Sequence, residues 1–287
     1  MSEALLRVED LWVRFAKPTG GVVEAVRGIS FEVGRERIGI VGESGSGKSM
    51  TGRSILRLVR PPGQVTAKQM AFLGTDLMAA SERRMRQIRG NRISMVMQDP
   101  KFSLNPVMTV GRQIAEAYRL HTGAPSGEAA RKTLEMLEAV QIRDPERVAK
   151  LYPHEVSGGM GQRIMIAMML APDPELLIAD EPTSALDVTV QLSVLRIMDR
   201  LVRDRGMGLI FISHDLNLVA TFCDRILIMY AGRIVETCRA DALMEAQHPY
   251  TRGLLSALPR LEDGQRRLSA LQRDPAWREA PSVDGYL

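Results

Sequence analysis

One eight-residue segment limits what this chain can fold into more than any other. Residues 42–49 read Gly-Glu-Ser-Gly-Ser-Gly-Lys-Ser and fit the pattern G-x-x-x-x-G-K-[ST] in full. The β-branched run at 38–41 predicts a buried strand before the loop, and residues 49–58 predict a helix after it. Glycines let such a backbone curl so that its N–H groups point at phosphates, and the helix start adds positive potential. The segment therefore predicts a phosphate-binding loop.

The side chains of this loop indicate a nucleoside triphosphate as the ligand. Lys48 is expected to reach the β- and γ-phosphates, and the Ser49 hydroxyl to ligate Mg²⁺. A glycine-rich turn without a ligand is the structural alternative, but the lysine, the serine and the preceding strand argue against it. Kinases, GTPases, helicases and transporters would all fit the loop alone. The predicted nucleotide-binding residues of this segment are Gly42, Glu43, Ser44, Gly45, Ser46, Gly47, Lys48, Ser49 and Thr51.

A second predicted strand ends in two carboxylates. Residues 176–182 read Leu-Leu-Ile-Ala-Asp-Glu-Pro, and the carboxyl ends of buried strands face the ligand crevice of an open α/β sheet. Alternation sends Asp180 and Glu181 to different faces. Asp180 is then expected to serve Mg²⁺ through water, and Glu181 to act as general base on the attacking water. Solvated strand terminators are the alternative, which the upstream phosphate loop disfavours.

Composition bounds the remaining function classes. A net charge of +4 and a pI of about 9.3 over 287 residues are too mild for a dedicated nucleic-acid binder. Two cysteines, Cys223 and Cys238, do not indicate a disulfide scaffold and fit a reducing compartment. The N-terminus lacks the pattern of a secretory signal. The apolar stretches at 164–171 and 209–212 fall short of the ~20 residues of a spanning helix, so any membrane role is expected to come through partners.

The order of patterns along the chain predicts an α/β fold. Residues 5–15 alternate apolar and polar, and with 22–33 they indicate antiparallel strands. Buried apolar strands alternate with helices from residue 158 to 237, which predicts a mostly parallel sheet covered on both faces. We therefore expect a P-loop NTPase core with an N-terminal antiparallel β subdomain, a helical insertion and a short C-terminal extension.

The expected domain boundaries follow from the same patterns. An ATPase domain would span residues 1–260, with a helical subdomain at about 110–170, where Ala, Glu, Leu and Met recur at helical spacing. Residues 261–287 would form the extension. Its last part, residues 272–287, is polar and without periodicity, so we expect it to be loosely ordered or docked on a partner.

A second glycine-rich segment opens a predicted helix at residues 156–163, Val-Ser-Gly-Gly-Met-Gly-Gln-Arg. Ser157 is a predicted N-cap, and Gly158 and Gly159 permit close approach to the helix-start N–H groups, which makes a second anion site. A capped helix is the structural alternative. The segment resembles the signature sequence of ABC transporters, with Val156 in place of the usual Leu and with departures at residues 160 and 161. In that family the signature completes the nucleotide site of a partner subunit.

Further family elements follow in order, and the resemblance spans roughly residues 5–260. Gln98 resembles the Q-loop glutamine, which implies a Mg²⁺ ligand that senses the membrane partner. Asp187 closes a Ser-Ala-Leu-Asp segment that resembles the D-loop, which contacts the other subunit. His214 resembles the switch histidine at the γ-phosphate, and Phe15 resembles the aromatic residue that stacks on adenine. The resemblance implies an ATP hydrolase, with Glu181, His214 and Lys48 as catalytic residues, that is coupled to transport.

The C-terminal part narrows the resemblance. His-Pro-Tyr-Thr at 248–251, with Val-Met-Gln-Asp-Pro at 96–100 and Ser-Leu-Asn-Pro at 103–106, resembles the dipeptide, oligopeptide and nickel importer branch. This implies import of a peptide-like solute, with nickel or another small solute as the alternative. Many members of the branch hold an iron–sulfur cluster in cysteines after the His-Pro-Tyr-Thr segment. No cysteine follows Cys238, so we predict no such cluster.

The branch also implies partners and a location. They are two transmembrane permeases, a second related ATP-binding subunit (a heterodimer, with a homodimer as the alternative) and, indirectly, an extracytoplasmic solute-binding protein. The location would be the cytoplasmic side of the inner membrane, peripherally bound. Soluble ABC proteins acting on DNA or ribosomes are the first rival, but this chain has one cassette and no sustained heptads. A P-loop kinase is the second, and it would leave Ser157 and His214 without roles. No nucleic acid partner is expected.

Overall fold

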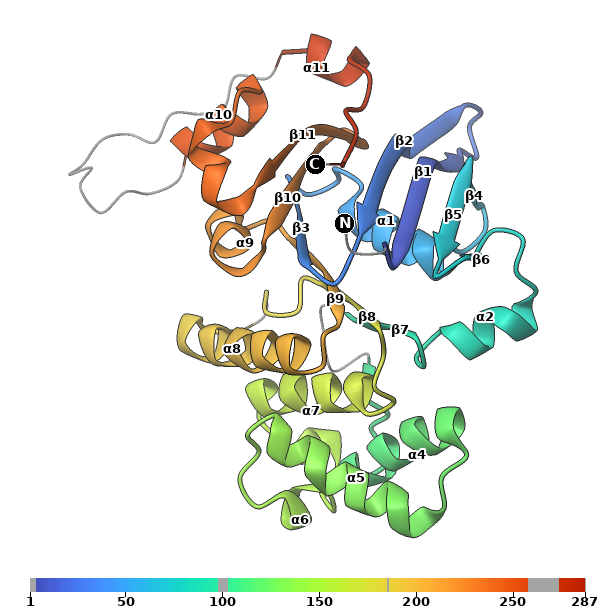
Figure 1. The fold of residues 1–287 in the computed structure, drawn as a ribbon, viewed down its shortest axis with the longest axis vertical. Helices are drawn as coiled ribbons and strands as arrows, with labels where there is room; N and C mark the ends of the chain where they lie inside the picture. Colours follow the sequence, from blue (N-terminus) through green and yellow to red (C-terminus); the bar gives the residue numbers. More distant parts are fainter. Residues whose placement is uncertain (1–3, 98–102, 185, 258–273, 287) are drawn as a thin grey trace, which may run out of the picture. The chain divides into compact units, whose positions relative to one another are not determined.

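The computed structural model describes residues 4–97, 103–184, 186–257 and 274–286. Within these ranges, no helix is long and apolar enough to cross a lipid bilayer. The chain divides into two compact units (Figure 1). Unit 1 is Met1–Ala80 with Ile210–Leu287, and unit 2 is Ser81–Leu209.

Unit 1 contains the predicted antiparallel sheet. Its strand order is β2-β1-β5-β6, and β4 also pairs with β1. The central strand therefore has partners on both sides, with Phe15 of β1 opposite Val23 of β2 and Gly63 of β4. The strands are β1 (Leu6–Ala16), β2 (Val22–Val33), β4 (Gly63–Thr66), β5 (Gln69–Phe72) and β6 (Thr75–Asp76).

A bulge in β1 explains why its apolar residues change parity. Leu6 and Val8 are fully buried at even positions, whereas Leu11 and Val13 are fully buried at odd positions. The pairing register with β2 shifts between Val8 and Leu11, and Asp10 within that interval has a left-handed φ of 50°. One extra residue in a strand turns the following side chains to the other face. The bulge thus keeps both apolar pairs in the core.

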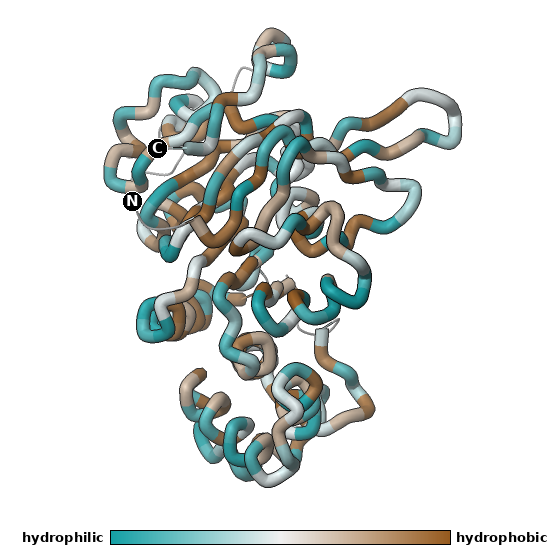
Figure 2. Tube along the Cα trace, turned by 45° about the vertical axis from the view of Figure 1, so that its right-hand side comes forward, coloured by the Kyte–Doolittle hydropathy of each residue, from teal (hydrophilic) through white to brown (hydrophobic). Residues whose placement is uncertain are grey.

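Unit 1 also contains the strand that leads into the phosphate loop. β3 (Arg37–Val41) pairs in parallel with β10 (Arg225–Tyr230), and β10 pairs in antiparallel fashion with β11 (Arg233–Arg239). β9 (Gly208–Ser213), of which residues 210–213 belong to unit 1, is buried along its whole length, as a strand covered on both faces should be. Helices α1 (Lys48–Ile55), α9 (Leu216–Phe222) and α10 (Pro249–Ser256) belong to this unit. In Figure 2, brown hydrophobic segments alternate with teal hydrophilic ones along the strands.

The end of the chain packs on unit 1, contrary to the expectation of a loosely ordered or partner-docked tail. We call residues 274–286, which include α11 (Ala276–Glu279), the C-terminal strap. The Val283 N–H donates to the Ile234 carbonyl oxygen at 2.8 Å, and the Gly285 N–H donates to the Ser30 carbonyl oxygen at 2.7 Å. These backbone bonds need no apolar pattern, so periodicity gave no sign of them.

Unit 2 combines two parallel strands with helices. β7 (Ile93–Val96) pairs with β8 (Leu176–Asp180) in parallel. The helical composition predicted from about residue 110 forms three helices in succession, before the helix that opens at the second glycine-rich segment. The helices of the unit are α2 (Glu82–Ile88), α4 (Val110–Thr122), α5 (Ser126–Ala139), α6 (Pro145–Val148), α7 (Gly158–Leu170) and α8 (Val188–Asp204). The predicted α/β fold class is confirmed.

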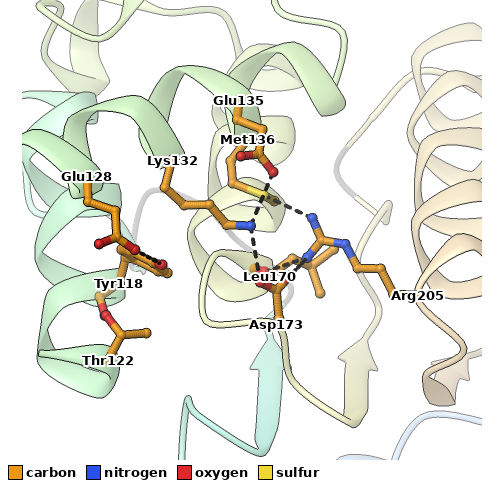
Figure 3. A network of polar contacts seen from close by, with 9 residues as sticks. All are labelled: Tyr118, Thr122, Glu128, Lys132, Glu135, Met136, Leu170, Asp173 and Arg205. Carbon is orange, nitrogen blue, oxygen red and sulfur yellow. Dashed lines mark hydrogen bonds and ion pairs between the residues drawn. The ribbon is translucent and has the colours of Figure 1, made fainter. Parts of the chain in front are cut away.

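A polar network ties the helices of unit 2 together (Figure 3). The Asp173 carboxylate, between α7 and β8, accepts hydrogen bonds from Lys132 of α5 at 3.1 Å and from Arg205 at the end of α8 at 2.5 Å. Arg205 also donates to the carbonyl oxygen of Leu170 at 2.7 Å. Its side chain is only 20% exposed, so these charge-assisted bonds are partly shielded from water. One carboxylate thus links three segments of the unit.

Replacing Arg205 with methionine is expected to lower the free energy of unfolding by about 1–3 kcal/mol, because the Leu170 carbonyl and the Asp173 carboxylate lose their shared donor. Urea unfolding followed by circular dichroism measures the change. The matched control is Arg203→Met, since Arg203 is 63% exposed and pairs with Asp199 on the same helix. That change should cost less than about 1 kcal/mol. Equal losses in both variants would contradict the structural role of the network.

Candidate nucleotide site

The phosphate loop leaves β3 at Gly42 and ends at Gly47, which caps α1. Gly42 has no room for a side chain, because a Cβ there would lie 2.1 Å from the Met229 carbonyl oxygen. Gly47 has a φ of 102°, and a Cβ there would lie 2.4 Å from the Ala25 carbonyl oxygen. As a glycine, it has no side chain that could accept a hydrogen bond from the first N–H groups of α1. The segment forms the predicted strand–loop–helix. Its glycines lie where the loop backbone closely approaches other backbone atoms.

Lys48 lies folded against the start of the loop. Its side chain is 5% exposed, and its Nζ donates to the carbonyl oxygens of Gly42 at 2.7 Å and Glu43 at 2.9 Å. These bonds hold the ammonium group beside the loop backbone. Thr51, one turn into the helix, is fully buried, and its hydroxyl donates to the Gly47 carbonyl oxygen at 3.1 Å. That hydroxyl supports the end of the loop from within the helix.

Two other predicted residues of unit 1 lie at strand ends. Phe15 is half-buried near the end of β1, and its Cε1 would be 2.6 Å from a Cβ at Gly63. Its ring therefore packs on bare backbone on one side. His214 is exposed and follows β9 directly. Asp215 caps α9 by accepting the Leu218 N–H at 3.1 Å, so the imidazole stands at a strand-to-helix turn.

The acidic pair of unit 2 lies at the carboxyl end of β8, as predicted. Asp180 is 4% exposed and Glu181 is half-buried. Glu181 has a left-handed φ of 48°, a conformation that costs a non-glycine residue about 1–2 kcal/mol. Its carbonyl oxygen accepts both the N–H and the hydroxyl of Ser184, at 3.4 and 3.2 Å. Backbone strain maintained by a turn is typical of functional positions.

The second glycine-rich segment has the predicted cap. Ser157 accepts the Met160 N–H at 3.3 Å, and α7 begins at the next residue. Gly158 has nothing within 4 Å of a would-be Cβ, whereas at Gly159 a Cβ would lie 2.6 Å from Cγ1 of Val190. Gly159 thus serves packing against α8, and Gly158 leaves the helix start open. Asp187 caps α8 by accepting the Val190 N–H at 3.0 Å.

The structure therefore places the predicted residues in two groups. The phosphate loop, Phe15 and His214 belong to unit 1, and the other described ones belong to unit 2. Gln98 lies outside the described residues. Within the part of the chain that the structure describes, no group of three or more His, Cys, Asp or Glu side chains could hold a metal ion. Mg²⁺ does not require one, because it binds through one or two carboxylates together with substrate phosphates and water. The Ser49 hydroxyl in unit 1 and the Asp180 carboxylate in unit 2 are each oxygen donors of the kind that Mg²⁺ binds.

Sequence reasoning missed the contribution of the C-terminal region to this site. A pocket of about 240 Å³ borders the loop and is lined by Glu43, Ser44, Gly45, Ser46, Tyr230, Ala231 and Arg278. Arg278 belongs to the C-terminal strap, and its carbonyl oxygen accepts a 2.8 Å bond from Arg27. The His-Pro-Tyr-Thr segment at 248–251 was the sequence signal for a specialised C-terminal region. Its pattern does not predict that this region lies beside the phosphate loop.

Comparisons with known proteins fit this geometry. Residues 26–184 match the family model described as "ABC transporter". The dimeric post-hydrolysis structure of the ATP-binding cassette MJ0796 with ADP and Pi resembles this chain with a TM-score of 0.73 and 25% identity, covering 82% of this chain and 98% of that one. The chain belongs to the ABC transporter family, and it carries the ATP-hydrolysing cassette of that family.

The C-terminal region is more specific. Residues 235–284 match the model described as "Oligopeptide/dipeptide transporter, C-terminal region", which confirms the predicted branch. A probable peptide ABC transporter ATP-binding protein of Sinorhizobium fredii is 50% identical, covering 92% of this chain and 80% of that protein. The oligopeptide transport ATP-binding protein OppD of Bacillus subtilis is 47% identical, with 94% and 76% covered. The dipeptide transport ATP-binding protein DppD of Haemophilus influenzae is 48% identical, with 94% and 82% covered.

Proposed function

We propose that this chain hydrolyses ATP to power import of a peptide-like solute, a di- or oligopeptide, through partner permease subunits. The observation that carries the proposal is the match of residues 235–284 to the oligopeptide/dipeptide C-terminal region. Relatives whose names specify peptide, oligopeptide and dipeptide transport support it, since they match more than nine-tenths of this chain. Nickel or another small solute is the alternative cargo.

In this proposal the phosphate loop and Lys48 bind the phosphates of ATP, and Phe15 stacks on the adenine. Ser49, Gln98 and Asp180 would hold Mg²⁺, which neutralises charge on the phosphates when bound. Glu181 takes a proton from the attacking water, and His214 contacts the γ-phosphate. Phosphoryl transfer to water depends mostly on positioning and charge stabilisation, so these groups need to be rigid rather than reactive. The buried strand and the turn behind Glu181 support that requirement.

The proposed assembly contains two ATPase subunits, two permeases and, indirectly, an extracytoplasmic solute-binding protein. The open helix start at Ser157 and Gly158, with Gly159 next in the same segment, would complete the nucleotide site of the second ATPase subunit, and Asp187 would contact that subunit. The dimeric structure of the MJ0796 cassette supports such pairing. A second, related ATPase is the proposed partner, and the complex would lie at the cytoplasmic side of the inner membrane.

Deleting the gene is expected to abolish uptake of radiolabelled di- or oligopeptides by intact cells, because the permeases lose their energy source. Plasmid-borne wild type should restore uptake, whereas Lys48→Ala should not. A matched control, Lys68→Ala, changes a lysine that is 75% exposed, pairs with Glu9 and is not a proposed site residue, and it should restore uptake fully. Normal peptide uptake together with loss of nickel uptake in the deletion strain would replace the peptide assignment with the alternative cargo.

A further inference from the structure

The tyrosine of the His-Pro-Tyr-Thr segment contacts the phosphate loop directly. Tyr250 is fully buried, and its hydroxyl accepts the backbone N–H of Glu43, the second residue of the loop, at 3.1 Å. The two residues are 207 positions apart. The bond therefore joins the C-terminal region to the backbone that is expected to surround the phosphates.

The N–H of Glu43 belongs to the same peptide group as the carbonyl of Gly42. That carbonyl accepts the Lys48 ammonium at 2.7 Å. A peptide group is planar, so its two edges turn together. Lys48 holds one edge of this plane and Tyr250 holds the other. A rotation of this peptide plane would break the bond to Tyr250 and would also move the Gly42 carbonyl oxygen that accepts Lys48. By holding the plane, Tyr250 therefore also holds an acceptor of Lys48.

Tyr250 is itself held in place. Its N–H donates at 3.2 Å to Nδ1 of His248, which is the N-cap residue of α10, and Glu236 of β11 accepts the His248 N–H at 3.2 Å. Burial lowers the pKa of His248, against an opposing effect of Glu236, which favours the neutral ring that this acceptor role requires. The hydroxyl is thus presented from a fixed helix start.

Two aromatic rings fix the orientation of the Tyr250 ring. Tyr230 packs against it with centroids 4.6 Å apart, and Trp277 of the C-terminal strap lies 6.2 Å from it. Aromatic pairs at these distances have preferred geometries. The hydroxyl therefore cannot swing away from Glu43 without disturbing both neighbours.

We propose that Tyr250 is a positioning residue of the nucleotide site, acting through the Gly42–Glu43 peptide on Lys48 to raise the affinity for nucleoside triphosphate. This gives the C-terminal region a direct part in ATP binding. α10 then holds the phosphate loop through the Tyr250 hydroxyl, and the strap holds the Tyr250 ring through Trp277.

Tyr250→Phe is the test, because it removes one oxygen and keeps the ring. With MgATP as the probe, we expect the Kd of the purified chain to rise roughly five- to fiftyfold, as for loss of a buried hydrogen-bond acceptor. The loss in kcat/KM should lie in KM rather than kcat. Hydrogen exchange in wild-type and variant protein should show faster exchange of the Glu43 amide, with unchanged exchange in β3.

Tyr286→Phe is the matched control. Its hydroxyl lies on the C-terminal strap, the segment that also contains Trp277, and donates to the Val8 carbonyl oxygen at 3.4 Å. It should leave both the Kd and the Glu43 amide exchange unchanged. A Kd for Tyr250→Phe within about twofold of wild type would overturn the proposal, since that is far less than one lost bond. An equal rise in Kd in Tyr286→Phe would also overturn it, because the effect would then belong to the C-terminal region in general and not to the Tyr250–Glu43 bond.

Discussion

Replacing Glu181 with glutamine is expected to lower the rate of ATP hydrolysis by about 10²- to 10⁴-fold while ATP binding is retained. The amide keeps the size of the carboxylate but cannot take a proton from water. Asp180, just before it, is 4% exposed at the end of a buried strand. The turn that follows, bonded through Ser184, keeps residue 181 in place in the variant. Phosphate release measures hydrolysis, and calorimetric titration with ATP measures binding.

The matched control is Glu175→Gln. Glu175 precedes the other end of β8, and its carboxylate accepts Arg92 at 2.8 Å. Loss of one partly exposed ion pair costs less than about 1 kcal/mol, so hydrolysis in this variant should remain at the wild-type level. Wild-type turnover in Glu181→Gln would remove Glu181 from the role of general base.

The same Glu181→Gln protein reports on pairing, because slow hydrolysis keeps ATP bound. Light scattering with and without ATP shows whether a monomer becomes a dimer. A dimer would show that this chain can pair with itself, which would support the proposal that the helix start at Ser157 completes the site of the other subunit. A monomer that binds ATP would show that a different ATPase subunit is required, which is the arrangement that we propose.

Gly47→Ala is expected to lower ATP affinity more than a hundredfold and the free energy of unfolding by about 2–5 kcal/mol. Two costs add. A left-handed φ costs a non-glycine residue about 1–2 kcal/mol, and overpacking costs about 1–3 kcal/mol. The φ of 102° and the 2.4 Å approach to the Ala25 carbonyl oxygen supply both. That carbonyl is backbone, so relief requires the loop itself to move away. Calorimetric titration and urea unfolding measure the two effects.

Gly74→Ala separates the two costs. Gly74 has a φ of 74°, and nothing lies within 4 Å of a would-be Cβ. The substitution should cost only the conformational part, about 1–2 kcal/mol, and it should leave ATP affinity unchanged. If Gly47→Ala were no more damaging than Gly74→Ala, the close approach of β2 to the loop would have no energetic consequence.

The phosphate loop, the acidic strand end and the capped glycine segment could be predicted because each is contiguous in sequence. A strand followed by glycines and Lys48 has few other uses, and Ser157 caps the helix that its position predicts. Fold class followed from buried runs alternating with helices. The parity change in β1 could not be predicted, because a bulge at Asp10 is set by pairing with β2.

The sequence by itself determined which residues we propose to bind phosphate and to polarise water, since those proposed roles depend on local backbone geometry and residue type. Only the tertiary structure decided what holds these residues in place. Tyr250 reaches the loop from 207 positions away, and the C-terminal strap binds through backbone groups of Val283 and Gly285. Such bonds carry no sequence periodicity, because every residue except proline has the same N–H and carbonyl. The packing of the whole unit determines which groups become the hydrogen-bond partners of a given backbone N–H or carbonyl.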